Sequence, residues 1–140
     1  MRFVFILCLI SCSTPYFNTF YNAERAFNKG EIAYFERKKA EGDEFSKFTN
    51  PDLTFAIQKA NKLLETFGAN DSNAYADDAY IMLTKAHIYQ FDYDLAERYA
   101  KLFIKNVPNS EKLAENSILL GDIYVAKNEF ELAKTAYANI

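Results

Sequence analysis

The fold of this chain is decided by two neighbouring stretches of similar sequence, residues 77–108 (DDAYIMLTKAHIYQFDYDLAERYAKLFIKNVP) and residues 114–140 (AENSILLGDIYVAKNEFELAKTAYANI). Within each stretch the apolar and small residues fall at steps of three and four, which is typical of amphipathic helices. The matching residues lie 37 positions apart, and they are Tyr80 and Ser117, Leu83 and Leu120, Thr84 and Gly121, His87 and Tyr124, Ala96 and Ala133, and Phe103 and Ile140. The pattern predicts two copies of one helical hairpin.

The sequence before residue 77 predicts a third, more divergent hairpin. Apolar residues at helical steps indicate a first helix over about residues 21–39, and Gly42 breaks it. Asn50, Pro51 and Asp52 then combine a capping amide, a proline at the first helical position and an acid near the positive helix end. The second helix is expected to end at Gly68. Its small and apolar residues Ala56, Ala60 and Leu63 parallel Ala96, Ala100 and Phe103.

The remaining helix boundaries follow from caps and breakers. The polar run 70–73 is expected to cap a helix over about residues 74–90, and Asp92 to begin its partner, which ends before Val107 and Pro108. Asn109 and Ser110 are expected to start the next helix, and Glu129 the last one. Gly121 and Ala133 are expected where these last two helices approach most closely. Because one hairpin cannot bury its apolar face alone, the three hairpins are expected to stack into an all-α, right-handed solenoid.

The amino end has the pattern of an export signal. Arg2 precedes the apolar run 3–10, and Ser11 and Cys12 follow it. We expect residues 1–11 to be a signal peptide, Cys12 to be lipidated, residues 12–20 to form a tether that contains Pro15, and residues 21–140 to form the helical domain. The alternative is that the run begins a buried helix or is an uncleaved anchor, although eight apolar residues are fewer than the roughly 20 that span a bilayer.

Charge and cysteine content argue against nucleic-acid binding and against a disulfide within the chain. The formal net charge is −3, and removal of Arg2 with the signal peptide makes it one unit more negative. Nucleic-acid binding requires a concentrated basic face, so it is not expected. The one basic cluster, residues 37–39, lies between Glu36 and Glu41 and indicates a solvated helix face. With Cys8 removed and Cys12 acylated, no disulfide within the chain is expected.

The two repeated stretches resemble the tetratricopeptide repeat on Leu120, Gly121, Tyr124 and Ala133, and on Ala96 and Pro108 of the earlier copy. The earlier copy departs from that family at Thr84 and His87. Cys12, the aromatic segment 16–23 and the run 75–79 further resemble the BamD-like outer-membrane lipoproteins. This resemblance implies a lipid-anchored protein at the periplasmic face of the outer membrane, binding periplasmic proteins or peptides and acting in outer-membrane protein assembly. The founding members have roughly five hairpins.

The resemblance also implies a concave binding groove along the first helix of each hairpin. Carried over by position, the groove residues are Asp78, Ile81, Lys85, Ile88, Tyr89, Glu115, Ile118, Asp122, Val125 and Ala126. Such a mixed acidic and apolar strip suits an extended or helical peptide with basic and apolar residues. Alternatively, half of these residues pack against a neighbouring repeat.

Aromatic residues are unusually abundant, with 13 Phe and 10 Tyr. Most are expected in the core, among them Phe27, Tyr34 and Phe35. Three lie close to the expected lipid anchor, where rings favour the membrane interface or dock on a partner, and these are Phe17, Phe20 and Tyr21.

No motif or residue spacing in the sequence predicts an active site, a metal site or a cofactor site. His87, the single histidine, is expected to be a packed side chain, and the neighbours Asp77 and Asp78 point about 100° apart on a helix. A non-enzymatic scaffold is therefore expected, with an unknown oligomeric state. The alternative is the amino-terminal interaction module of a longer cell-envelope enzyme, because no polar closing helix covers the last apolar face before Ile140.

Overall fold

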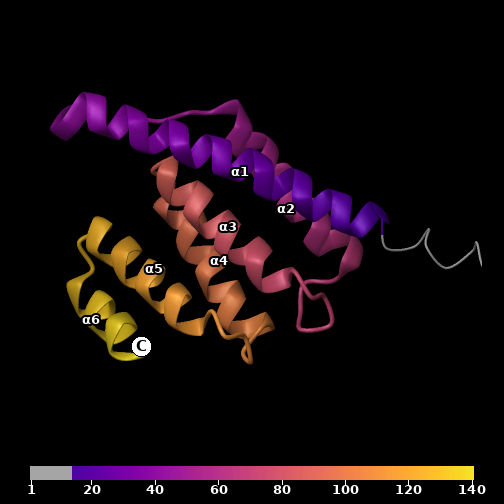
Figure 1. The fold of residues 1–140 in the computed structure, drawn as a ribbon. Helices are drawn as coiled ribbons and strands as arrows, with labels where there is room; N and C mark the ends of the chain where they lie inside the picture. The colour runs from indigo at the N-terminus through magenta and orange to yellow at the C-terminus, as the bar shows by residue number, and fades with distance from the viewer. Residues whose placement is uncertain (1–13) are drawn as a thin grey trace, which may run out of the picture.

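The computed structural model describes residues 14–140, and this part of the chain contains helices and no strand (Figure 1). The all-α prediction is therefore confirmed for these residues. The expected signal peptide and Cys12 lie outside them. Within residues 14–140, six α-helices follow one another: α1 (Thr14–Glu41), α2 (Pro51–Phe67), α3 (Ala76–Tyr89), α4 (Tyr93–Asn106), α5 (Leu113–Ala126) and α6 (Phe130–Ala138). A short 3-10 helix, η1 (Gly42–Glu44), follows α1.

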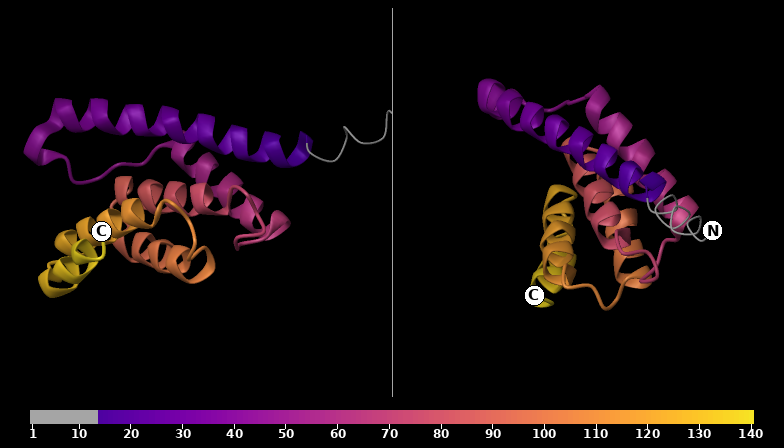
Figure 2. Two further views of the ribbon diagram at one scale, coloured as in Figure 1. Left: turned by 60° about the horizontal axis from the view of Figure 1, so that its bottom comes forward. Right: turned by 45° about the vertical axis from the view of Figure 1, so that its right-hand side comes forward.

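The helices pack in three consecutive pairs. Helix α1 contacts α2, α3 contacts α4, and α5 contacts α6, while α2–α3 and α4–α5 contacts join each pair to the next. The first helices of the pairs also meet, because α3 contacts both α1 and α5. Figure 2 shows the α3–α4 pair between the other two, with α1 extending well beyond the helices beneath it. None of the helices within residues 14–140 is long and apolar enough to cross a membrane.

The second and third pairs repeat each other in the backbone. Helices α3 and α5 begin 37 residues apart and end 37 residues apart, and α4 and α6 also begin 37 residues apart. The turns between the helices match as well, because Phe91 and Asn128 both adopt a positive φ, of 61° and 62°. The period seen in the sequence is therefore a period of the structure.

Among the six residue pairs that define the sequence repeat, all but one are alike in burial. Leu83 and Leu120 are both buried, as are Ala96 and Ala133. Phe103 is fully buried, whereas Ile140, its counterpart, is 63 % exposed. The exception lies at the end of the last pair, where the described chain has no further hairpin to cover it.

At one contact between the two helices of a hairpin, the last two hairpins place the larger side chain on opposite helices. A β-carbon on Gly121 would lie 2.2 Å from the Tyr137 ring, so the closest neighbour of Gly121 across the α5–α6 pair is Tyr137 rather than the expected Ala133. The equivalent residues of the α3–α4 pair are Thr84 and Ala100, both fully buried. A larger residue on the first helix is thus matched by a smaller one on the second. The Tyr137 hydroxyl donates to Asp122 at 2.6 Å, and this bond raises the pKa of Tyr137 to about 12.

Helix α1 begins at Thr14, seven residues before the helix start expected at about residue 21, so residues 14–20 of the expected tether are helical. Two rings hold this part of α1 to the fold. Tyr16 packs against Phe67 with ring centroids 4.6 Å apart, and Phe20 stacks on Tyr75 at 4.2 Å. Proline in the first turn does not oppose a helix, because the N–H groups of that turn have no intrahelical partner. Pro15 therefore marks a helix start rather than a linker.

The connector between α1 and α2 contributes aromatic side chains to the core. Phe48 is buried, and the rings of Phe45 and Phe48 lie 5.1 and 5.5 Å from the Tyr34 ring. Tyr34 and Phe27 are core residues as predicted, whereas Phe35 is half-exposed. The first hairpin therefore has an aromatic core that extends into its loop.

The predicted caps are confirmed for α2 and α4. Asn50 accepts hydrogen bonds from the Asp52 and Leu53 amides at 2.8 and 3.1 Å, and Asp92 accepts from the Leu95 amide at 3.2 Å. Gly68 ends α2 with a φ of 103°. Helix α3 begins two residues later than predicted, and α5 begins three residues after Ser110, because turns held by polar side chains precede both helices.

Candidate functional site: a groove between α1, α3 and α5

The first helices of the three pairs enclose a groove of about 240 Å³. Helix α3 forms its floor, and residues of α1 and α5 line its sides. The lining residues are Phe20, Glu24, Phe27, Asn28, Glu31, Asp78, Ile81, Met82, Lys85, Lys112 and Glu115. Four carboxylates face two lysines, so the groove has an excess of negative charge over an apolar base.

The wall on α1 was not predicted from the sequence. Glu24, Asn28 and Glu31 follow one another at steps of four and three, so they lie on one side of the helix. Phe20 and Phe27 adjoin them on the side that packs toward α3. The spacing of the acids was visible in the sequence, but only the α1–α3 contact shows that this side of α1 faces a groove.

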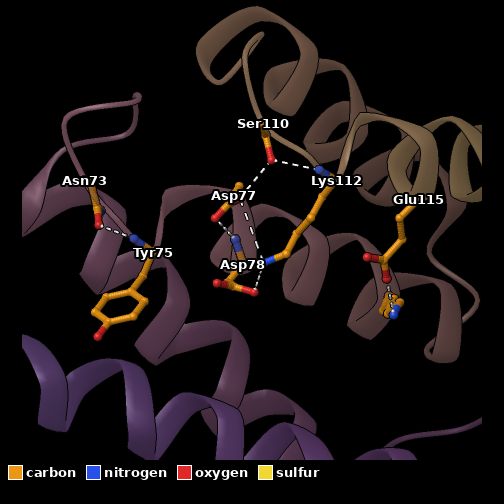
Figure 3. Close-up of polar contacts among 8 residues, drawn as sticks. Asn73, Tyr75, Asp77, Asp78, Ser110, Lys112 and Glu115 are labelled. Atoms are coloured by element: carbon orange, nitrogen blue, oxygen red, sulfur yellow. Dashed lines mark hydrogen bonds and ion pairs between the residues drawn. The ribbon is translucent and has the colours of Figure 1, made fainter.

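Ion pairs between α3 and α5 hold the floor of the groove (Figure 3). The Lys85 ammonium lies 2.6 Å from Glu115 Oε1. Lys112 binds the Asp78 carboxylate and lies 3.8 Å from Asp77 Oδ2, while the Ser110 hydroxyl donates to Asp77 at 2.8 Å. The adjacent acids Asp77 and Asp78 therefore fix the start of α5 against the start of α3. These partly exposed pairs contribute about 0–1 kcal/mol each to stability.

A buried tyrosine joins α3 to the α1 wall. Tyr89 stacks on Tyr34 with centroids 4.4 Å apart, and its hydroxyl donates to Glu31 Oε1 at 2.5 Å. Burial and this hydrogen bond raise the pKa of the Tyr89 hydroxyl, so it remains protonated and keeps donating. Glu31 is thus held in place, while Glu24 lies exposed on the same wall.

The residues expected to line a groove fall into three groups. Asp78, Lys85 and Glu115 line it, and all three take part in ion pairs. Ile81 also lines the groove, as part of its apolar base, but it is 7 % exposed. Tyr89 is buried and Ile88 is half-buried outside the lining, so these two side chains serve packing. The α5 residues are exposed and lie outside the lining of this groove, and they are Ile118, Asp122, Val125 and Ala126.

The three aromatic residues expected near the membrane differ in exposure. Phe17 and Tyr21 are about half-exposed and stack on each other at 6.0 Å. Phe20 packs on Tyr75 and lines the groove. Only the first two present open ring surface to a bilayer or a partner.

His87 packs inside the α3–α4 pair. Its ring stacks on Tyr99 at 5.4 Å, and Nδ1 lies 4.0 Å from Asp92 Oδ2 without a hydrogen bond. Burial lowers the pKa of His87, and the nearby Asp92 only partly opposes this. Over residues 14–140, no group of three or more His, Cys, Asp and Glu side chains is arranged to hold a metal ion.

Comparisons with protein-family models, with curated proteins and with solved structures found no match to this chain.

Proposed function

We propose that this chain is a non-enzymatic, lipid-anchored scaffold of the bacterial cell envelope that binds a protein partner through the α1–α3–α5 groove. The anchor is Cys12, and the partner is a peptide segment with basic and apolar residues. The resemblance to BamD-like lipoproteins suggests the periplasmic face of the outer membrane and a role in the assembly of its proteins.

The 37-residue backbone repeat supports a right-handed solenoid of the tetratricopeptide type. In that arrangement the first helix of every pair lines one concave side, and α1, α3 and α5 share such a side in this chain. A concave surface that several repeats build together is the usual binding surface of repeat proteins. This shared groove is the observation that carries the proposal.

The chemistry of the groove supports a basic and apolar ligand. Lys85 and Lys112 already neutralise Glu115 and Asp78. Glu24 is the exposed carboxylate of the α1 wall, beside the apolar surface of Phe20 and Phe27. Apolar contacts supply affinity in such a site, and a carboxylate sets orientation and association rate.

Site-specific photo-crosslinking in intact cells tests this proposal. A photoreactive residue at Glu24 is expected to form an adduct with a discrete partner, and one at Glu65 is the matched control. Both positions are exposed acids, but Glu65 lies on α2 and outside the groove lining. Identical adducts from the two positions, or none from either, would refute a groove-bound partner.

A charge reversal sharpens the result. Glu24→Lys is expected to reduce the yield of an adduct formed from a photoreactive residue at Asn28 by about tenfold, whereas Glu65→Lys leaves it unchanged. Glu24 suits this test better than Asp78 does, because reversing Asp78 also breaks the ion pair with Lys112. An equal yield from the two variants would show that the groove charge plays no part in recognition.

The anchor is tested separately. Cells fed a fatty-acid probe are expected to label the chain, and Cys12→Ser is expected to abolish the label and release the chain from membranes. Cys8→Ser is the matched control and keeps both properties. Labelling that persists in Cys12→Ser would exclude this anchor while leaving the groove proposal intact.

A further inference from the structure

One exposed side of helix α1 carries apolar and polar side chains in a symmetric order. Six exposed residues follow one another there at steps of three and four, and they are Phe17, Tyr21, Glu24, Asn28, Ile32 and Phe35. This spacing places them along one side of the helix, over a length of about 27 Å at 1.5 Å per residue. These six residues are called the α1 stripe below.

The α1 stripe contains the large exposed apolar side chains of its helix. They are Phe17, Tyr21, Ile32 and Phe35, which are 53, 47, 59 and 52 % exposed. Phe17 and Tyr21 stack on each other, and the Phe35 ring lies 5.2 Å from Tyr34 and 5.8 Å from Tyr89. These contacts leave about half of each side chain open to another surface.

A continuation of the hairpin stack would not cover the α1 stripe. Each hairpin of such a stack contacts only its neighbours. The α3–α4 pair lies between the α1–α2 pair and the α5–α6 pair (Figure 2), so a hairpin added after α6 would lie on the far side of the stack from α1. The occupant of the stripe therefore has to be inferred from the stripe itself.

The order of side chains is the same from either end of the stripe. It runs from an aromatic ring through a second large apolar side chain to a polar one, and the matching residues are Phe17 and Phe35, Tyr21 and Ile32, and Glu24 and Asn28. All three couples share a midpoint near residue 26. Two antiparallel copies of α1, related by a twofold axis at this midpoint, would therefore place every stripe residue opposite its match.

The polar centre of the stripe favours an antiparallel second copy over other occupants. The Asn28 amide would donate to the Glu24 carboxylate of the second copy at two symmetric places. A parallel copy would instead oppose Glu24 with Glu24, and a bilayer would have to accommodate this acid between the apolar ends. Glu31 lies on the same side of α1, but its carboxylate is held by the Tyr89 hydroxyl at 2.5 Å. Arg25 is exposed beside Glu24 and supplies a cation at the centre.

We propose that the α1 stripe is a dimer interface, on which α1 of a second copy packs antiparallel about a twofold axis near residue 26. The apolar couples at the two ends supply affinity, and the acid–amide couples at the centre set direction. A single pair of helices is a small interface, so a dissociation constant in the micromolar range is expected. The dimer goes beyond the proposed function and requires neither the lipid anchor nor a groove ligand.

The dimer shares two residues with the groove, because Glu24 and Asn28 also line it. Dimer formation and ligand binding in the groove are therefore expected to compete. The mass of an adduct formed in cells from a photoreactive residue at Glu24 separates the two, since a second copy doubles the mass of the chain.

Sedimentation equilibrium of the full chain tests the dimer, with Cys8→Ser and Cys12→Ser to exclude disulfides. Ile32→Glu is expected to raise the dissociation constant at least about tenfold, because it places a carboxylate against apolar side chains. Ile104→Glu alters another exposed isoleucine, on α4, and is the matched control that leaves the constant unchanged. Circular dichroism shows that both variants are folded.

A charge exchange tests the centre of the interface. Asn28→Asp places two carboxylates opposite each other in both central couples and is expected to raise the dissociation constant about fivefold. Adding Glu24→Gln restores one acid and one amide to each couple, with their positions exchanged, and is expected to recover most of the affinity. An effect of Asn28→Asp on the folding of α1 alone would not be reversed in this way.

Disulfide crosslinking tests the direction of the two helices. A Phe17→Cys chain mixed with a Phe35→Cys chain is expected to form a linked dimer on oxidation, because these positions lie opposite each other. Neither chain alone is expected to do so, since the two copies of either position lie about 27 Å apart along the helix axis. Both chains carry Cys8→Ser and Cys12→Ser.

Three results would overturn the proposal. The first is a chain that stays monomeric at about 100 μM, well above a micromolar dissociation constant. The second is a dimer that Ile32→Glu does not weaken, and the third is a linked dimer of Phe17→Cys alone, which would show parallel helices. A monomeric chain that binds vesicles of phosphatidylethanolamine and phosphatidylglycerol, and loses this binding in Ile32→Glu, would assign the stripe to a bilayer.

Discussion

The α3–α4 and α5–α6 hairpins have the same backbone and different surroundings. Their helices and turns match at a spacing of 37 residues, down to the positive φ of Phe91 and Asn128. Yet the first of the two is covered on both sides, and the second on one. Burial in this chain therefore depends on the neighbouring hairpin, whereas local sequence decides where the helices begin and turn.

The largest expected effect comes from the position at which the two hairpins differ most in burial. Phe103→Ala is expected to lower the free energy of unfolding by about 3–5 kcal/mol, because it leaves a cavity in a fully buried site. Ile140→Ala, at the equivalent position, is expected to change it by less than about 0.5 kcal/mol. Urea denaturation followed by circular dichroism measures both. Similar losses would mean that Ile140 is covered in solution.

A change at the contact between Gly121 and Tyr137 is expected to have an intermediate effect on the free energy of unfolding. Gly121→Thr is expected to cost about 1–3 kcal/mol, because the new β-carbon overlaps the Tyr137 ring. Adding Tyr137→Ala recreates the Thr84 and Ala100 arrangement of the preceding hairpin and is expected to recover part of that loss. A double-mutant cycle of unfolding free energies measures the coupling. Strictly additive single effects would contradict the proposed exchange.

The smallest expected effect is a pH dependence of the stability that arises from His87 in the α3–α4 hairpin. The pKa of His87 is lowered in the folded chain from an ordinary value of 6.5, so the unfolded chain binds the proton first. Stability is therefore complete above about pH 6.5 and falls as the pH drops from there toward the lowered pKa. His87→Phe, which keeps a ring against Tyr99, is expected to remove this component.

Midpoints of urea unfolding between about pH 7.5 and 5.5 measure this effect. The equivalent residue of the last hairpin is Tyr124, and a Tyr124→Phe chain is the control, since it should keep the slope of the native chain. A native chain whose midpoint does not fall in this range would show that His87 titrates normally.

The sequence predicted those features of the fold that depend on residues close together in the chain. The 37-residue period gave the hairpins, and the polar caps Asn50 and Asp92 gave two helix starts, because each depends on a few neighbouring residues. The start of α1 was missed, since Tyr16 and Phe20 are held by Phe67 and Tyr75 from distant parts of the chain. Nothing in the sequence indicated a positive φ at Phe91.

The groove was predicted less completely than the hairpins. The positions carried over by resemblance included Asp78, Lys85 and Glu115, which line it. They also included Tyr89, which the crossing of α1 buries. Helix α1 supplies a whole wall that no repeat position suggested, because its length and its contact with α3 are tertiary properties.

The early start of α1 has a mechanical consequence for an anchored chain. With the lipid on Cys12, only Ser13 separates the acylated residue from a helix of 28 residues, which at 1.5 Å per residue is about 42 Å long. The rings of Tyr16 and Phe20 pack against Phe67 and Tyr75 and so hold the amino-terminal end of this helix against the rest of the molecule. In the lipid-anchored form proposed above, one residue would therefore join the lipid to the folded domain, in place of the expected tether of residues 12–20.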